Sequence, residues 1–345
     1  MSCMTINETT AIQANQTGGV HWPAEWEPHT CSWMMFPCRT AIWSHGLETA
    51  HKVFSQVANQ ISEYEPVKML ILPEHLAKAK KYLSSAIELI NCSLDDSWAR
   101  DTSPIWVTQN NQLIAKDFLF NGWGEQFVPH DKDRKIAQFI AQYEKVTCQS
   151  VDMVLEGGAV HSNGNGLLLT TKECLLHPNR NPTLSQQDIE QQLKLELGVE
   201  QIIWLERGIV GDVDTNGHVD NIACFVNPST ILTQKTLVLG ENTEIYHLNK
   251  QVINEHGLSL VEIPEPEAKY QSGERIPLSY INFYIINNAV IMPAFGCKQD
   301  DSAYQMMVDL FPERKIHMID ANEILVGGGG IHCITMQQPV APGNC

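Results

Sequence analysis

The chain has 345 residues, of which 43% are hydrophobic and 18% are charged, and its formal net charge is −17. This composition excludes a disordered or fibrous protein and favours a globular one. The excess of acidic residues also argues against a nucleic-acid partner, because phosphate groups are neutralised by Lys and Arg.

The first 20 residues are polar, and we expect them to be loose and to precede a single domain over residues 21–345. They contain neither the basic nor the apolar region of a secretory signal, and no apolar run approaches the roughly 20 residues that cross a bilayer. We therefore expect a cytoplasmic protein without a membrane partner. The ten cysteines form no C-x-x-C pair, which favours reduced thiols over a cysteine zinc site.

Short apolar runs of strand length recur along the chain, mostly bounded by Gly, Pro, Asn or Asp. They occupy residues 68–73, 105–107, 113–120, 166–171, 201–205, 221–226, 236–239, 282–295 and 315–319. Longer stretches with helical periodicity lie among them, at residues 48–65, 74–90, 184–198 and 302–311. The mixture predicts an α/β protein.

Two features narrow this class. No G-x-G-x-x-G or Walker motif follows an early strand, which argues against a doubly wound nucleotide-binding sheet. The expected strands outnumber the expected helices by roughly two to one, which suits repeated β-rich units better than simple βα alternation. Periodicity alone does not count those units.

Four segments place reactive side chains beside glycines: DDSWARDTSP (95–104), LEGGAV (155–160), GDVDTNGHVDN (211–221) and GGGGIHC (327–333). The third begins like a calcium-binding EF-hand loop, but Ala223 stands where the loop needs its final Glu. The same stretch continues into VDNIACFV (219–226), which has the pattern of a strand. If His218 and Asp220 lie on that strand, their spacing of two residues points both side chains to one face. A polar surface turn before a strand explains the same residues.

Cys333 follows four consecutive glycines, which let backbone approach a ligand closely and leave the next side chain uncrowded. A thiol is mostly protonated at neutral pH, so it needs a neighbouring positive charge or a base to act as a nucleophile. A buried structural thiol is the alternative, since many free cysteines are small core residues. His332 changes this little, because adjacent side chains on a strand point to opposite faces.

Trp98, Arg100 and Asp101 lie in an Asp-rich segment, where a turn or a helix cap is an equally good explanation. Glu156 follows an apolar run and precedes two glycines, which is typical of a strand end with a tight turn after it. A carboxylate there can accept the ring N–H of a histidine and fix its tautomer. None of these segments identifies a site by itself.

In this order and spacing, the segments resemble the agmatine deiminase and bacterial-type peptidylarginine deiminase family of the guanidino-group-modifying superfamily. The resemblance covers nearly the whole chain. It extends from WPAEWEPHTCSWMMFP through SWARDTSPIWV, FNGWGE, LEGGAV, LLLTTKECLLHPNRNP, TNGHVDNIACF and SYINFYI to GGGGIHCITMQQP.

The resemblance implies a five-bladed α/β propeller of ββαβ modules with pseudo-fivefold symmetry, the pentein fold, around a central substrate channel. It also implies a hydrolase of linear amidines in polyamine metabolism, which converts agmatine to N-carbamoylputrescine and ammonia. The expected partner is then a small cationic guanidino compound, and no metal or organic cofactor is needed. The oligomeric state stays open, with a homo-oligomer as one option.

Carried over residue by residue, the resemblance assigns a nucleophile, a histidine, its glutamate partner, two guanidinium-binding aspartates and a substrate-contacting wall. These are Cys333, His218, Glu156, Asp101 with Asp220, and Trp98. A guanidinium is planar, charged at neutral pH, and offers N–H donors that carboxylates receive in pairs. A cation bound beside Cys333 also favours its thiolate, so the substrate would help to activate its own nucleophile.

Three positions depart from the family pattern. Asn216 and Gly330 stand where the family usually has Asp and Asn, and Lys298 follows Cys297 where an acidic residue is common. These residues lie beside the expected site residues rather than among them. They therefore bear on substrate identity, for which free and peptidyl arginine are the alternatives.

Three other interpretations compete with this one. A Cys-His amidase would use the same nucleophile, but the carboxylates around its thiolate would oppose the charge without a cationic substrate. A non-catalytic binding protein has no evident need for the nucleophile. A metallohydrolase would have only one His in its ligand set, which is Asp212, Asp214, His218 and Asp220, and this set fits no familiar zinc pattern.

Overall fold

The computed structural model describes residues 19–236, 239–271 and 273–342. Of the segment expected to be loose, residues 1–18 lie outside this part of the chain. Val20 belongs to the short strand β1 (Val20–His21), which pairs antiparallel with β5 (Ile105–Gln109). The described fold therefore starts slightly before residue 21. None of the described helices is long and apolar enough to cross a membrane.

Five sheets share one construction, in which two antiparallel strands are followed by a third strand parallel to the second. The first three triplets are β5, β6 (Gln112–Leu119) and β7 (Thr147–Val154); β8 (Val160–Ser162), β9 (Leu167–Thr171) and β10 (Gln201–Leu205); and β11 (Ala223–Asn227), β12 (Thr230–Lys235) and β13 (Ser259–Pro264). The other two are β16 (Tyr284–Ile286), β17 (Ala289–Ala294) and β18 (Lys315–Asp320); and β19 (Met336–Pro339), β2 (His29–Met35) and β3 (Val67–Ile71).

The last of these sheets joins the two ends of the chain, because β19 pairs with β2. A further parallel strand, β4 (Glu88–Asn91), extends it beyond β3, and β14 (Tyr270–Gln271) forms a separate hairpin with β15 (Glu274–Arg275). The mixture of antiparallel and parallel pairs confirms the predicted α/β class.

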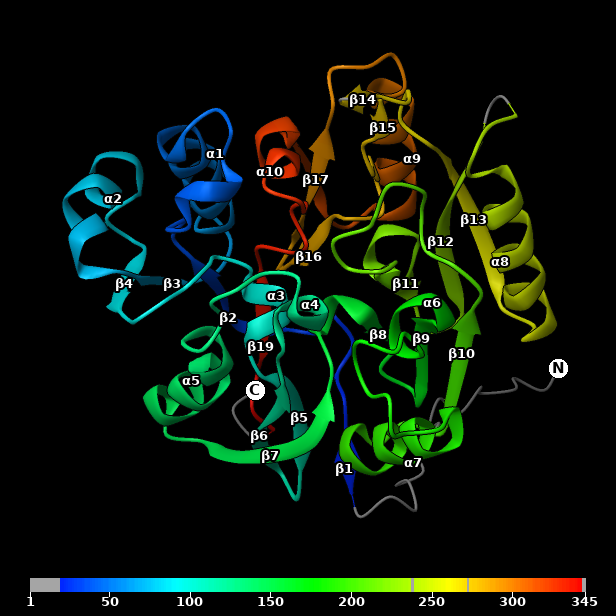
Figure 1. Cartoon of the computed structure of the whole chain (residues 1–345), viewed down its shortest axis with the longest axis horizontal. Coiled ribbons are helices and arrows are strands. Elements are labelled where there is room, and N and C mark those ends of the chain that lie inside the picture. Colours follow the sequence, from blue (N-terminus) through cyan, green and yellow to red (C-terminus); the bar gives the residue numbers. More distant parts are fainter. Residues whose placement is uncertain (1–18, 237–238, 272, 343–345) are drawn as a thin grey trace, which may run out of the picture.

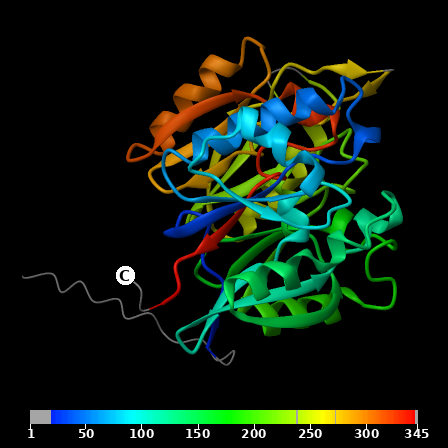
Figure 2. The same ribbon diagram turned by 90° about the vertical axis from the view of Figure 1, so that its left-hand side faces the viewer.

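Helices connect the second and third strands of each triplet. They are α5 (Ile136–Glu144), α6 (Lys172–Leu175) with α7 (Gln186–Leu197), α8 (Thr243–Glu255), α9 (Asp300–Leu310) and α1 (Leu47–Ile61); α2 (Leu76–Tyr82) then connects β3 to β4. In Figure 1, α1, α2, α5, α7, α8 and α9 lie toward the outside of the molecule, whereas the short α3 (Ala99–Thr102) and α4 (Gly122–Glu125) lie near its middle. Figure 2 shows α1 and α2 from their own side, in front of the sheets.

Local sequence explains the predicted helices. In α1, buried Ala50, Phe54, Val57 and Ile61 recur three or four residues apart and form one apolar face. Helix α7 begins with a reciprocal capping box between Ser185 and Asp188 and ends at a left-handed glycine, where the helix-breaking conformation is cheapest.

Two predicted elements were wrong. The helix expected over residues 74–90 ends at Tyr82, and its last part forms β4 instead, because pairing with β3 outweighs helical propensity there. In the strand expected over 236–239, residues 237–238 lie outside the described part, and Thr236 and Leu239 belong to no strand. The described strand that precedes this range is β12, which ends at Lys235. Helices α5 and α8 were not predicted.

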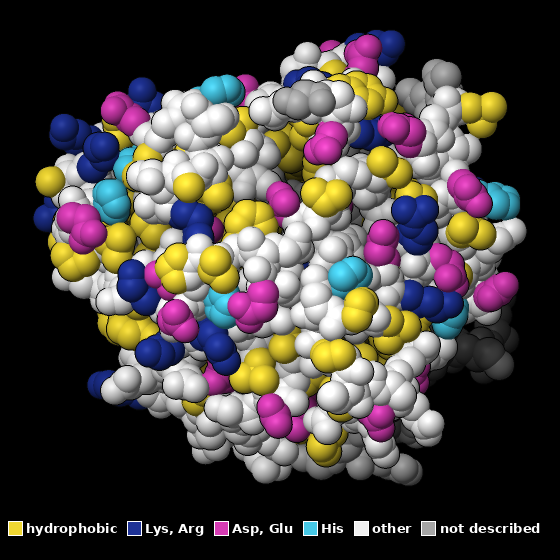
Figure 3. Space-filling view, in the orientation of Figure 1, with side chains coloured by type: hydrophobic (Ala, Val, Ile, Leu, Met, Phe, Trp, Pro, Cys, Tyr) yellow, Lys and Arg dark blue, Asp and Glu magenta, His cyan; other side chains and the backbone are white. Residues whose placement is uncertain are grey.

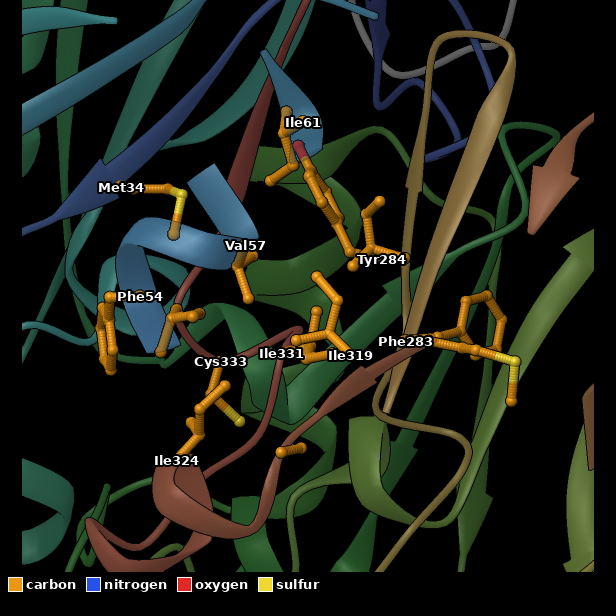
Figure 4. Close-up of a cluster of buried hydrophobic side chains, with 14 of the residues drawn as sticks. Met34, Phe54, Val57, Ile61, Phe283, Tyr284, Ile319, Ile324, Ile331 and Cys333 are labelled. Carbon is orange, nitrogen blue, oxygen red and sulfur yellow. The ribbon is translucent and has the colours of Figure 1, made fainter. Parts of the chain in front are cut away.

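The largest apolar core extends to the glycine-rich segment at the C-terminal end. Figure 4 shows Cys333 close to Ile324 and Ile331, in a cluster that also receives Phe54 and Val57 from α1. Ile324 belongs to the short helix α10 (Asn322–Val326), which precedes the glycines. The cysteine is therefore fixed on a packed base, in a turn between α10 and β19.

Candidate active site

The glycine run before Cys333 passes against two tryptophans. A Cβ on Gly327 would lie 2.4 Å from the Trp43 ring, and one on Gly329 would lie 2.4 Å from the Trp98 ring. The two indoles are stacked, with centroids 6.0 Å apart. Only glycines let the backbone approach these rings so closely, and this explains two of the four consecutive glycines.

Cys333 lines a pocket of about 330 Å³, together with Trp98, Asp101, Trp123, Phe127, Asp214, Thr215 and Gly327, Gly328 and Gly329. Two indoles, a phenyl ring and two carboxylates are thus its main side chains. Trp98 is the residue before α3 and lines this pocket; its expected contact with substrate stays a prediction.

Asp101 is held rigidly at the pocket wall. It lies in α3, where Oδ1 accepts a hydrogen bond from the Gly158 backbone N–H (2.9 Å) and Oδ2 accepts one from Nε1 of Trp123 (2.9 Å). Burial raises the pKa of Asp101, and the nearby carboxylates of Asp220 and Glu156 add to this against the opposing effect of His218.

From the sequence, His218 and Asp220 were considered as part of a strand, but in the structure they do not lie on one. They belong to a 3-10 turn, Val219–Asn221 and the residue before it, and β11 begins only at Ala223. The two side chains nevertheless face one point. A Cβ on Gly158 would lie 2.6 Å from His218 Nδ1 and 3.0 Å from Asp220 Oδ2.

The same Cβ would lie 3.0 Å from Asp101 Oδ1, so a histidine and two carboxylates converge on the space that Gly158 leaves free. His218 Nδ1 is 4.0 Å from Asp101 Oδ1. None of the three groups is exposed to bulk solvent. Electrostatic interactions among them are therefore strong.

Glu156 is completely buried near His218. Its Oε1 accepts a hydrogen bond from Nε of Arg180 at 2.6 Å, and Glu156, His218 and Cys174 place ligating atoms within 4.8 Å of one another. Burial alone would lower the pKa of His218, but Asp101, Cys174 and Glu156 outweigh it and raise that pKa well above its ordinary value. The surrounding groups therefore favour the imidazolium form of His218.

The Cys333 thiol lies close to Asp220 and Asn282. Its Sγ is 3.8 Å from Asp220 Oδ2 and receives a hydrogen bond from Asn282 Nδ2 at 3.3 Å. Burial, Asp220 and Asp101 together raise the pKa of the thiol well above its ordinary value. In the free site the cysteine is thus protonated, and a bound cation would reverse the effect of the two carboxylates.

The four side chains that a metallohydrolase would use as ligands do not lie together. Asp212 accepts hydrogen bonds from Thr215 Oγ1 (2.6 Å) and from the His218 backbone N–H (3.2 Å), so its carboxylate shapes the loop. In the described ranges, the Asp212, Asp214, His218 and Asp220 side chains form no common ligand cluster.

Comparisons with known proteins assign the chain to a family. The model of the Porphyromonas-type peptidyl-arginine deiminase family matches residues 21–339. The chain belongs to this family. It is 42% identical over 338 residues to a Legionella pneumophila protein named "Putative agmatine deiminase", and the match covers 93% of this chain and 95% of that relative.

Solved structures of the same kind resemble the whole fold. The agmatine deiminase of Enterococcus faecalis has a TM-score of 0.88 at 31% identity, covering 97% of this chain and 99% of its own. A Cys-to-Ser variant of the C. jejuni agmatine deiminase with substrate bound has a TM-score of 0.89 at 28% identity, with the same coverage. DDAH from Pseudomonas aeruginosa, at 12% identity and a TM-score of 0.52, shares the fold alone.

Several residues of the site were not singled out from the sequence: Trp123, Arg180, Asn282 and His332 were each quoted in a family segment or named without a role. Arg180 also donates to Asn216 Oδ1 (2.7 Å), one of the three departures. A second departure, Gly330, is explained by Asn282, because a Cβ there would lie 2.3 Å from Asn282 Oδ1. Only contacts across the fold show these roles.

Proposed function

We propose that the protein is an agmatine deiminase, which hydrolyses agmatine to N-carbamoylputrescine and ammonia. The main support is a thiol surrounded by carboxylates. Asp101 and Asp220 both raise the pKa of Cys333, after burial itself. Such a thiol becomes a nucleophile only when a cation occupies the site, and a guanidinium is a cation whose carbon can be attacked.

The lining of the pocket distinguishes among guanidino compounds. Asp214 is one of its two carboxylates, and neither Arg nor Lys is among the described lining residues. Free arginine would bring its carboxylate toward Asp214 without a cationic partner, whereas the primary amine of agmatine would pair with it. Trp98, Trp123 and Phe127 offer apolar surface for the methylene chain between the two charged ends.

In the proposed mechanism, Asp101 and Asp220 hold the guanidinium, and the Cys333 thiol releases its proton to solvent as this cation binds. The resulting thiolate attacks the central carbon. A C–S bond forms and gives a tetrahedral adduct. His218, held as the imidazolium, then gives its proton to the departing nitrogen, the C–N bond breaks, and ammonia leaves. The enzyme now carries a positively charged thiouronium on Cys333.

In the second half of the reaction, neutral His218 takes a proton from a water molecule that attacks the same carbon. The new tetrahedral adduct collapses by breaking the C–S bond, which releases the ureido product and restores the thiol and the imidazolium. Glu156 stabilises the imidazolium from behind, as a buried carboxylate near the ring.

We also propose that the five similar sheets are the blades of a five-bladed propeller in a single catalytic domain over residues 21–345. In support, each triplet has the ββαβ order, and the sheet of β19 and β2 joins the two ends of the chain. The short helices and turns with the site residues then lie at the centre of the ring, consistent with the position of α3 in Figure 1.

The relatives support the substrate and the nucleophile. The similar solved structures include agmatine deiminases, and one of these is a Cys-to-Ser variant with substrate bound. The family name instead refers to peptidyl arginine. Asp214 in the pocket lining favours agmatine, because its amine is charged and can pair with this carboxylate, whereas a peptide backbone is neutral.

The test is ammonia release from agmatine, free arginine, a peptidyl-arginine and an asymmetrically methylated arginine, with wild type and Cys333→Ser in chelator-containing buffer. We expect release from agmatine alone, and none with the variant. Release only from another compound would keep the chemistry and overturn the substrate. If no compound is hydrolysed, the proposal of a deiminase is wrong and a binding protein is favoured.

A further inference from the structure

A second pocket lies directly behind the catalytic residues. It measures about 500 Å³, and its wall includes Glu25, Arg100, Gly157, His161 and His332. The residues that follow Arg100 and His332 in the chain, Asp101 and Cys333, line the substrate pocket instead. Consecutive side chains of two segments therefore face opposite pockets, with a thin protein layer between them.

One hydrogen-bonded chain crosses this layer. His332 places Nδ1 2.8 Å from Asp220 Oδ2 and Nε2 2.8 Å from Glu25 Oε2. The backbone N–H of Ile285, in β16, donates to Glu25 Oε1 at 2.8 Å and fixes that carboxylate. All three ionisable side chains are buried.

The geometry determines the protonation of His332. A neutral imidazole has one N–H, but both ring nitrogens of His332 face carboxylate oxygens, so both must donate. Burial and Arg100 act against the imidazolium, yet Glu25 and Asp220 outweigh them and raise the pKa of His332. His161, whose ring lies 6.3 Å away, stays neutral because burial lowers its pKa to about 4.

The surroundings shift the pKa of Asp220 in the direction opposite to that of Asp101. Burial acts to raise both pKa values, but the His332 hydrogen bond and charge lower that of Asp220, whereas that of Asp101 is raised. The pKa values of the two carboxylates proposed to hold the guanidinium are thus shifted in opposite directions. Removal of the imidazolium would make Asp220 resemble Asp101.

We propose that Glu25 and His332 are positioning residues, which keep Asp220 ionised and oriented toward the guanidinium from the side opposite the substrate. The inference rests on the proposed function and adds a second layer to it. Glu25 touches no substrate. It acts by holding His332 charged, and His332 acts by holding Asp220.

The first test is the pH profile of kcat/KM for agmatine with wild type, Glu25→Gln, His332→Asn and His332→Leu. Loss of a hydrogen bond to a charged group corresponds to roughly tenfold or more in kcat/KM near neutral pH. Because the pKa of Asp220 rises in the variants, we expect the acid limb to move to higher pH and the activity to recover as pH increases. His332→Asn, which keeps a donor near Asp220, should lose less than His332→Leu.

The control is Glu196→Gln, which removes the partner of the buried Lys116 amine (2.7 Å) away from this chain of residues. We expect its profile to match wild type. An equal loss of activity at every pH in Glu25→Gln and His332→Leu, with no movement of the acid limb, would mean that the two residues are merely structural and would overturn the proposal.

A second measurement does not depend on the reaction. Nitrogen-15 NMR can follow the His332 ring, with its signals assigned by comparison with His332→Asn. Over about pH 5.5–8.5, a range that brackets the ordinary histidine pKa of about 6.5, wild type should show an imidazolium throughout. In Glu25→Gln the ring should titrate within this range. A wild-type ring that titrates near that value contradicts the proposal. If wild type hydrolyses no guanidino compound, the proposed function fails while this measurement still tests the relation of Glu25 to His332.

Discussion

Gly158 and His218 are so closely packed that a Cβ at Gly158 would lie 2.6 Å from the His218 Nδ1. The same atom would crowd Asp101 and Asp220, so the absence of a side chain at Gly158 allows the three groups to face one point. The backbone N–H of Gly158 also binds Asp101. One small residue therefore both makes room for the site and orients one of its carboxylates.

We expect Gly158→Ala to displace His218 and to lower kcat/KM on the order of 100-fold, since displacement of a catalytic group by about 1 Å has this effect. Steady-state kinetics would measure it. The control is Gly257→Ala, where φ is +68° but nothing lies within 4 Å of the new Cβ. It should lose stability from backbone strain and keep its activity; equal kinetics for both variants would contradict the role of Gly158.

The Cys333 thiol should titrate at unusually high pH in the free enzyme. Burial, Asp220 and Asp101 all oppose the thiolate. We expect the thiolate absorbance near 240 nm, taken as the difference between wild type and Cys333→Ser, to appear only above the ordinary pKa of about 8.5. Asp220→Asn removes one opposing charge and should lower this pKa. A wild-type thiolate already present at neutral pH would mean that the substrate is not needed for activation.

The sequence predicted the site segments but not how they meet. Glycines beside Cys333 and Glu156 drew attention to two of them, and in the structure both sets of glycines allow a close approach of backbone to neighbouring groups. The assumption of a strand at His218 and Asp220 was wrong, since a 3-10 turn brings them together instead. His332 was given little weight because neighbouring side chains on a strand face opposite ways. It does line another pocket, yet its ring also bonds to Asp220, which lies 112 residues earlier and beside Cys333. No spacing along the chain predicts such a contact.

The elements of the fold were likewise predictable where local sequence decides them and not where distant contacts do. The apolar face of α1 is such a local signal, and it was sufficient to predict that helix. The expected helix over residues 74–90 was shortened because β4 gains a hydrogen-bonded partner in β3, which is a tertiary effect. The five sheets repeat one strand order, but the sequence indicated this only by an excess of expected strands over expected helices. Periodicity identifies a strand without showing which strands pair with it.

Arg180 should be essential for stability. Its guanidinium and the Glu156 carboxylate are completely buried as an ion pair, and Arg180 Nη2 donates to the Thr215 carbonyl at 3.0 Å. We expect Arg180→Met to lower the free energy of unfolding by about 3–5 kcal/mol, because it leaves a buried charge without its partner. Urea denaturation would measure this loss.

The matched control for that measurement is Lys250→Met, which breaks a partly exposed ion pair with Glu262 at 2.8 Å. Its effect should stay below about 1 kcal/mol, since solvent screens such pairs. Glu156→Gln added to Arg180→Met should restore part of the stability. If Arg180→Met is no more harmful than Lys250→Met, Glu156 is not a buried charge that depends on Arg180.

Asp214 should determine the preference for a distal amine. We expect Asp214→Asn to raise the KM for agmatine roughly tenfold, the usual effect of losing one charge-assisted hydrogen bond. Butylguanidine has the same guanidinium and chain without the amine, so its KM should be unchanged by the substitution. Burial and Asp212 raise the pKa of Asp214 in the free site, and an ammonium bound there would lower it again.

The ratio of kcat/KM for the two compounds, measured in both proteins, isolates this contact from any general damage to the pocket. An equal loss for agmatine and butylguanidine would show that Asp214 shapes the pocket without reading the amine, and a shorter or neutral guanidino compound would then become the better candidate substrate.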